Sequence, residues 1–241
     1  MKLDVLAVAA HPDDAEISVG GTLLRLAAAG RRVGIVDLTR GEMGTRGTAQ
    51  DRAREVEAAS RALGLAARAN LELPDGRLEP NLDARERLAA LLRELRPDVV
   101  LAHHLEDLHP DHRAAGRIAR DAWYLAGLAR LAELSGGAPA RRPPRIYHFP
   151  SHVAFEPTFV VDVTPVWERK VELVRCYASQ LAPAHERDRG EHFLFGADIL
   201  SRAETKARTW GERVGVRYGE PLLHLGPLPC LDPLLAPEPA R

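Results

Sequence analysis

Two clusters of histidine and aspartate carry the side chains that bind divalent metals and move protons. The first is Ala10–Glu16, which reads AHPDDAE, and the second is His109–His112, which reads HPDH. Imidazole and carboxylate ligands together favour Zn²⁺ or a similar divalent ion, and a catalytic zinc commonly has three protein ligands and one open position. His11, Asp14 and His112 would supply such a ligand set.

Each cluster directly follows an apolar run, which places it at the end of a predicted buried strand. Near-continuous apolar strands that alternate with helical patterns predict a parallel sheet covered by helices on both faces. In doubly wound sheets the first and fourth strands commonly lie side by side, and ligands bind beyond their carboxyl ends. We therefore expect a Rossmann-like, doubly wound α/β fold in which the two clusters converge.

The predicted elements follow from this alternation and from Gly and Pro residues at their ends. Strands are predicted over Leu3–Ala9, Val33–Leu38, Ala69–Leu73, Val99–His103, Ile146–Phe149 and Thr158–Val163. Helices are predicted over Gly20–Ala29, Ala49–Leu63, Ala84–Leu95, Pro110–Leu134, Pro165–Tyr177 and Ala197–Val214. We expect one domain over residues 1–225 and an irregular C-terminal tail over residues 226–241.

A plainer interpretation of the two clusters stays open. Asp13 and Asp14 could cap a helix, and His109 and His112 could form the polar first turn of another. A protonated histidine is disfavoured at a helix N-terminus, whereas a neutral, metal-bound histidine is not. Four such groups at one sheet edge favour the metal site over a pair of ordinary turns.

The composition excludes several classes of protein. The 241 residues are 45% hydrophobic and 28% charged, as in soluble globular domains. A net charge of -1 gives no reason to expect nucleic acid or an acidic membrane as a partner. Cys176 and Cys230 lie far apart, so we expect no disulfide framework and a cytoplasmic location. The apolar run at the start is too short to span a membrane or to be a signal peptide, so we expect no membrane partner.

AHPDDAE and HPDH together resemble the LmbE-like, or PIG-L, family of zinc-dependent N-acetylglucosamine deacetylases. The resemblance covers about Asp4 to Leu222. Within the family, the chain is similar to the bacillithiol biosynthesis deacetylases over Asp37–Gly47, Pro150–His152, Phe159–Asp162 and Cys176–Gln180. The resemblance implies an LmbE-like fold, a small amino-sugar substrate, a homo-oligomer and one Zn²⁺ per chain, although ligands of these types also accept Fe²⁺.

The resemblance also implies a role for each motif residue. The implied zinc ligands are His11, Asp14 and His112. Asp13 is implied as the general base that takes a proton from the attacking water, and His109 as the group that stabilises the oxyanion or protonates the leaving amine. Asp111 would orient a motif histidine. Some relatives have a tyrosine where this chain has Asp107, so a tyrosine contribution must come from elsewhere or be absent.

Substrate contacts are expected from residues beyond the two motifs. Arg46, in the loop after the second strand, suits an anionic group such as a malate carboxylate, or is an ordinary solvated loop residue. The resemblance suggests that Arg52 and Asp75 contact sugar hydroxyls, while Asp75 could instead be a turn residue. Glu42 is placed to face the pocket.

Three further histidines lie near the predicted site. We expect His103 and His104 to be satisfied polar residues at the sheet edge rather than extra ligands, and His152 to line the pocket. Arg113 either binds an anion or covers the helix surface.

These expectations lead to a zinc-dependent deacetylase, and we expect it to act on N-acetylglucosaminyl malate in bacillithiol biosynthesis. The alternatives are another glucosaminide (a mycothiol precursor, chitobiose or a glycolipid) or an amidase on thiol conjugates. A nucleotide-binding module would need a Gly-rich phosphate loop after the first strand, where this chain has two carboxylates. A non-catalytic binding protein would not need Asp13 and His109.

Overall fold

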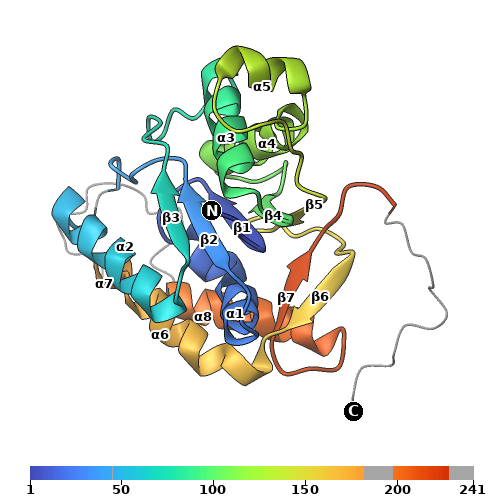
Figure 1. The fold of residues 1–241 in the computed structure, drawn as a ribbon. Coiled ribbons are helices and arrows are strands. Elements are labelled where there is room, and N and C mark those ends of the chain that lie inside the picture. Colours follow the sequence, from blue (N-terminus) through green and yellow to red (C-terminus); the bar gives the residue numbers. More distant parts are fainter. Residues whose placement is uncertain (45, 182–197, 228–241) are drawn as a thin grey trace.

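The computed structural model describes residues 1–44, 46–181 and 198–227, and its centre is a five-stranded parallel sheet (Figure 1). The strand order is β3-β2-β1-β4-β5. The strands are β1 (Val5–Ala9), β2 (Val33–Asp37), β3 (Ala67–Asn70), β4 (Val99–His103) and β5 (Arg145–Phe149). β1 pairs with β2 on one side and with β4 on the other. The predicted neighbourhood of the first and fourth strands is therefore confirmed.

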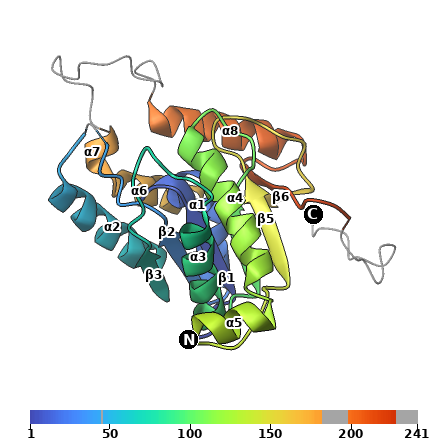
Figure 2. The ribbon, with the colours of Figure 1, turned by 90° about the horizontal axis from the view of Figure 1, so that it is seen from above.

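Helices cover both faces of the sheet, which confirms the predicted fold class (Figures 1 and 2). One side carries α3 (Leu82–Leu95), α4 (Pro110–Leu125) and α5 (Ala129–Ser135), and the other carries α1 (Asp14–Ala28), α2 (Ala49–Leu63) and α6 (Trp167–Arg175). Successive side chains of β1 alternate between the two cores, with Leu6 and Val8 in the first and Ala7 and Ala9 in the second. A strand buried on both faces must be apolar throughout, as β1 is.

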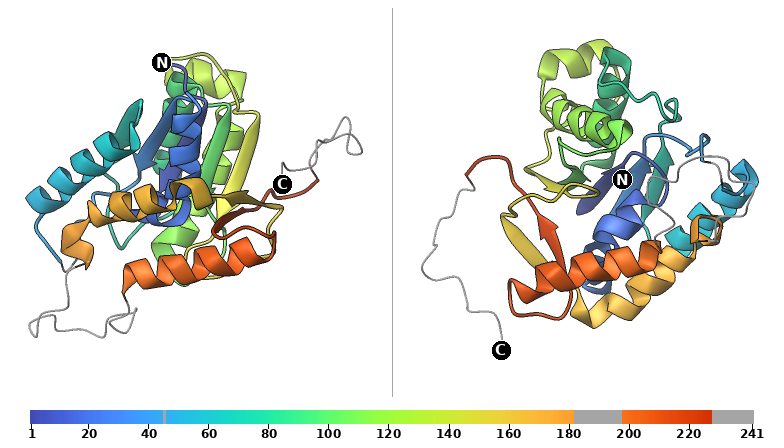
Figure 3. Two further views of the ribbon diagram at one scale, coloured as in Figure 1. Left: turned by 90° about the horizontal axis from the view of Figure 1, so that it is seen from below. Right: turned by 180° about the vertical axis from the view of Figure 1, so that it is seen from behind.

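A small antiparallel sheet forms one flank of the molecule (Figure 3). It consists of β6 (Phe159–Asp162) and β7 (Gly219–Leu222), and α8 (Ile199–Glu212) packs against both strands. The connections include the 3₁₀ helix η1 (Thr164–Val166) and the short α7 (Ala178–Leu181). β7 was not predicted, because a four-residue segment that contains Gly219 and Pro221 lacks the pattern of a strand.

Several element boundaries differ from those predicted. α1 begins at Asp14, six positions before the predicted start at Gly20, because the polar first turn hides the helical pattern there. The helix predicted over Pro110–Leu134 is two helices, since the chain turns at Gly127, where an added Cβ would lie 2.8 Å from Arg142 Cβ. β3 ends at Asn70, and Glu72 then has a positive φ of 52°.

Other predictions lie outside what the structure describes. The predicted start of the last helix at residue 197 and the tail from residue 228 fall outside the described residues, and the single-domain boundary at residue 225 stays a prediction. Within the described ranges, none of the helices combines the length and the apolar character that crossing a membrane requires.

A close backbone contact fixes α4 at the end of β4. A Cβ built on Gly116 would lie 2.7 Å from the carbonyl oxygen of His103 and 2.8 Å from that of His104, closer than real Cβ contacts. Glycine is therefore required for α4 to approach the strand end. His112, one turn earlier in α4, is held at the carboxyl end of β4 as a result.

The first helix is interrupted just after the AHPDDAE motif. Val19 has non-helical dihedral angles (φ -132°, ψ 15°), so the amides of Gly21 and Thr22 form a second helix start. Glu220 of β7 accepts hydrogen bonds from both amides, at 2.9 and 2.7 Å, and Lys170 of α6 forms an ion pair with it. Because Glu220 and Lys170 are both buried, this contact fastens β7 and α6 to α1.

Candidate metal centre and active site

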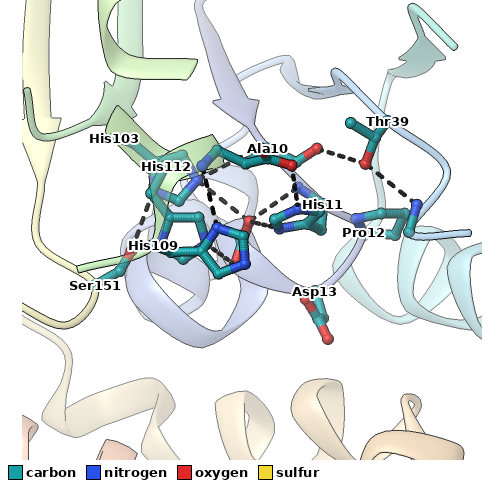
Figure 4. Close-up of polar contacts among 12 residues, drawn as sticks. Ala10, His11, Pro12, Asp13, Thr39, His103, His109, His112 and Ser151 are labelled. Atoms are coloured by element: carbon teal, nitrogen blue, oxygen red, sulfur yellow. Dashed lines mark hydrogen bonds and ion pairs between the residues drawn. The ribbon is translucent and has the colours of Figure 1, made fainter. Parts of the chain in front are cut away.

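The carboxyl ends of β1 and β4 bring the two motifs together (Figure 4). His11 Nδ1 lies 3.2 Å from Asp14 Oδ2, and His112 Nε2 lies 3.3 Å from Asp14 Oδ1. The ring centroids of His11 and His109 are 5.0 Å apart. Residues about 100 positions apart in the sequence thus form one cluster, as the topology predicted.

Asp14 is the centre of this cluster. His103 Nε2 lies 3.3 Å from Asp14 Oδ2, so three imidazoles surround one carboxylate. Burial by itself raises the pKa of Asp14, but the charges of His112 and His103 and the hydrogen bonds of the histidines hold it well below its usual value. Asp14 is therefore ionised and attracts a cation.

The residues present fit a divalent metal. One ligand atom from each of His11, Asp14 and His112 lies within 4.8 Å of the other two. Burial lowers the pKa of His112, but the carboxylates of Asp14 and Asp107 outweigh burial and raise it to about 9. The two carboxylates therefore favour positive charge at this place. Two imidazoles and one carboxylate also match the donor set of catalytic zinc sites.

Two further carboxylates lie beside the second ring nitrogen of His11. His11 Nε2 is 3.1 Å from Asp75 Oδ1 and 3.3 Å from Asp111 Oδ2. Asp111 also accepts hydrogen bonds from the amides of Gly76 and Leu78, and Asp75 accepts one from the amide of Met43 at 2.7 Å. The contact of Asp111 agrees with the expected orienting role. Asp75 contacts the same histidine and also lines the adjoining cavity, so its expected contact with sugar hydroxyls stays a prediction.

Asp13 lies beside this cluster and points away from the imidazoles, into the adjoining cavity (Figure 4). Its φ of 114° is a strained value for a residue with a side chain. Burial and the neighbouring Asp14 raise its pKa to about 7, although Arg52 and His11 act in the opposite direction. A carboxyl group with a pKa near neutrality suits a general base.

Arg52 contacts the loop of the first motif. Its buried guanidinium donates to the carbonyl of Pro12 at 2.6 Å and to Asp13 Oδ2 at 3.3 Å, and the expected sugar contact stays a prediction. Arg52 also lines the cavity. Arg52 therefore pairs with Asp13, the candidate base, and stabilises its ionised form.

His109 caps the N-terminus of α4. Its Nδ1 accepts a hydrogen bond from the amide of Asp111 at 3.1 Å, which leaves the proton of the neutral ring on Nε2. Burial and the charges of His112 and His11 lower its pKa to about 4. His109 therefore offers a neutral N–H donor to the cavity that it lines.

Asp107 is a site residue that the sequence analysis missed. Its Oδ1 lies 3.2 Å from His112 Nδ1 and 2.7 Å from His152 Nδ1. Burial raises the pKa of Asp107, but hydrogen bonds from His112 and His152 and from backbone amides outweigh it and lower the pKa far below its usual value. A ligating histidine commonly donates its second N–H to a carboxylate. The spacing of Asp107 and His112 in the sequence does not predict that they form such a pair.

The remaining polar residues at this edge have local partners. His103 Nε2 accepts from the amide of Ala10 at 3.1 Å, and its Nδ1 is 3.1 Å from Ser151 Oγ. His104 Nδ1 contacts the backbone of Glu106. Both histidines are thus satisfied polar residues, as expected. Arg113 donates to the carbonyl of Asp107, so it supports the loop before α4.

Asp107→Asn is expected to weaken metal binding by about 10- to 100-fold, because the outer partner of His112 is changed. A competition titration with a chromophoric zinc chelator measures this affinity. Asp98→Asn is the matched control, since Asp98 pairs only with Lys2 and Arg141 at the surface among the described residues. If Asp107→Asn binds zinc with the affinity of the wild type, Asp107 does not contribute to metal binding.

A cavity of about 950 Å³ opens in front of the cluster. The five motif residues on its wall are His11, Asp13, Asp14, His109 and His112. His152 and Arg46 also line it, as expected, and the guanidinium of Arg46 donates to the carbonyl of Gln180 at 2.9 Å. Glu42 does not line this cavity, contrary to expectation, because its carboxylate turns to accept from the amides of Asp75 and Arg40.

Comparison with known proteins agrees with this geometry. A model of the PIG-L family, described as GlcNAc-PI de-N-acetylase, matches residues 6–123, which include both motifs. The conserved protein TT1542 from Thermus thermophilus is 40% identical, with a TM-score of 0.84 over 98% of this chain and 99% of that one. N,N'-diacetylchitobiose deacetylase from Pyrococcus horikoshii is 30% identical, with a TM-score of 0.77 over 93% of this chain and 83% of that one.

A curated relative extends the comparison to a second sugar. The 1D-myo-inositol 2-acetamido-2-deoxy-alpha-D-glucopyranoside deacetylase of Kineococcus radiotolerans is 30% identical over 73% of this chain and 68% of the relative. The parallel sheet, the two converging motifs and the match to relatives over most of their length have one explanation in common: the chain belongs to the PIG-L family.

Proposed function

We propose that the protein is a zinc-dependent hydrolase that removes the N-acetyl group from an N-acetylglucosaminide. The observation that carries this proposal is the arrangement of His11, Asp14 and His112 at one wall of a cavity, with Asp13 directly beside them. The deacetylases among the relatives act on N-acetylated glucosaminides according to their names, which supports the reaction class.

The chain's own residues would divide the chemistry as follows. His11, Asp14 and His112 would hold the metal, which when bound supplies a Lewis acid that polarises the amide carbonyl and lowers the pKa of water toward about 7. Asp13 takes a proton from the attacking water. The N–H of His109 donates to the oxyanion that develops on the carbonyl oxygen.

Collapse of the tetrahedral species then breaks the carbon–nitrogen bond. The proton held by Asp13 passes to the departing nitrogen, so that acetate and a free amine leave. Arg52 steadies Asp13 in its ionised form at the start and end of this cycle. No serine or cysteine nucleophile is needed in this scheme.

For the substrate, we propose N-acetylglucosaminyl malate, a precursor of bacillithiol. The four short stretches that resemble bacillithiol deacetylases support this choice, as does an arginine, Arg46, on the cavity wall. The inositol conjugate and N,N'-diacetylchitobiose are the alternatives, because relatives are named for those substrates.

Acetate release from these three substrates tests the proposal. Purified protein is stripped with a chelator and reloaded with Zn²⁺ or Fe²⁺, and elemental analysis gives the metal content. We expect one metal per chain, metal-dependent release of acetate, and the highest kcat/KM on the malate conjugate. Release from none of the three would contradict a deacetylase of this substrate class, whereas a preference for another conjugate would discard malate alone.

A further inference from the structure

One face of α8 forms the cavity wall that adjoins β7. The residues on this face are spaced three and four positions apart, so they share one side of the helix. They are Ile199, Arg202, Ala203, Lys206, Ala207 and Trp210. The wall is therefore an apolar strip that carries two cationic side chains, Arg202 and Lys206.

Among the described residues, neither cation has a carboxylate partner. Like charges four positions apart on a helix repel each other. The guanidinium of Arg202 makes no hydrogen bond or ion pair with any residue in the described ranges 1–44, 46–181 and 198–227, and the amine of Lys206 donates only to the carbonyl of Ser151 there. Burial, Arg202 and Lys170 lower the pKa of Lys206, although Asp107 acts in the opposite direction.

Two other cations on or near this helix have acidic partners. Arg208, on another face of α8, contacts Glu204 at 2.7 Å and the hydroxyl of Tyr218 at 3.0 Å. Lys170, which lines the cavity close to α8, is paired with Glu220. The positive charge that faces the cavity from α8 is thus confined to Arg202 and Lys206.

This charge lies close to the candidate metal centre. Lys206 contacts the backbone of Ser151, whose Oγ is 3.1 Å from His103 Nδ1. His103 Nε2 in turn is 3.3 Å from Asp14. Ser151 and His103 thus separate Lys206 from a candidate ligand, and Arg202, Lys206 and the motif residues all line the same cavity.

We propose that Arg202 and Lys206 form a subsite for a carboxylate on the aglycone of the glucosaminide. The inference rests on the proposed function, because it presumes that the acetamide lies at the metal. An uncharged aglycone would remove water from two cations without supplying a counter-charge, which costs free energy. A carboxylate would instead form charge-assisted hydrogen bonds with both. The family match ends at residue 123, so this wall lies outside the segment that carries the shared motifs.

A matched series of glycosides tests the subsite. The series consists of the carboxymethyl, carbamoylmethyl and aminoethyl glycosides of N-acetylglucosamine, which are acidic, neutral and basic at similar size. We expect the zinc-loaded wild type to prefer the carboxymethyl over the carbamoylmethyl glycoside by at least 10-fold in kcat/KM. Arg202→Glu/Lys206→Glu should invert the order and favour the aminoethyl glycoside.

Arg208→Glu is the matched control, since it makes the same charge change on the same helix away from the cavity. It should keep the wild-type order. The single variant Arg202→Gln should show an intermediate preference, which covers the case in which the double variant folds poorly. An unchanged preference in folded Arg202 and Lys206 variants that turn over all three glycosides would overturn the subsite and leave the proposed function intact.

Binding separates the two proposals if no glycoside is hydrolysed. Calorimetric titration of the zinc-loaded protein with the same three glycosides does not depend on turnover. Tighter binding of the carboxymethyl glycoside by the wild type, lost in the double variant, would support the subsite although the reaction had been assigned wrongly. Equal binding of the acidic and neutral glycosides by the wild type would overturn the subsite on its own.

Discussion

Asp13→Asn is expected to lower kcat for acetate release by about 10²- to 10⁴-fold while the protein keeps its metal, because general base catalysis contributes about that much. The amide has nearly the same shape as the carboxyl group but cannot accept the proton of the attacking water. Initial rates of acetate release, combined with elemental analysis of the same samples, measure both properties.

The pH profile adds a second measure of the same variant. Asp13 acts as a base only when ionised, so wild-type activity falls as the pH drops through its pKa and Asp13 takes up a proton. This acidic limb should be absent from the residual activity of the Asn variant. Asp83→Asn, on an exposed turn of α3, is the control. Wild-type kcat in Asp13→Asn would remove the residue from the base role.

Asp14→Ala is expected to abolish both metal binding and activity. Its carboxylate contacts His11, His103 and His112, so the substitution removes a candidate ligand and the shared partner of three imidazoles at once. The loss of metal affinity should exceed the roughly 100-fold that loss of an outer partner costs at most. Elemental analysis after gel filtration measures the bound metal.

The contrast with Asp13 makes this prediction specific. The two residues are neighbours and both are largely buried acids, yet one variant should keep the metal and the other should lose it. Circular dichroism establishes that each variant is folded. Full metal content in folded Asp14→Ala would mean that the cluster holds its ion through other groups, such as the second set formed by His11, His109 and Asp111.

The sheet and the meeting of the motifs could be predicted because they depend on patterns that are local in the sequence. Apolar runs mark β1 and β4, and the topology of doubly wound folds places His11 and His112 at the same edge. The partners of those residues could not be predicted in this way. Asp107 contacts His112 from the irregular segment before α4, and Arg52 of α2 contacts Asp13 in the loop after β1.

Residues with two plausible partners were the most difficult. Glu42 and Asp75 lie in loops after neighbouring strands, and a carboxylate there can bind either a substrate hydroxyl or a backbone amide. In this fold Glu42 accepts a hydrogen bond from the amide of Asp75, and Asp75 accepts one from the amide of Met43. The cavity wall on α8 was also missed, because a helical pattern in sequence does not say what its face lies against.

The contact between Glu220 and the interrupted helix α1 has an evolutionary consequence. It joins β7 to main-chain amides, and amides are present whatever side chains surround them. This contact uses no side chain of α8, so the cavity-lining cations Arg202 and Lys206 can change without disturbing it, whereas the buried Ala207 and Trp210 cannot change as freely. A lineage can in this way inherit an unaltered hydrolytic centre and acquire a new leaving-group preference by substitutions in a single helix.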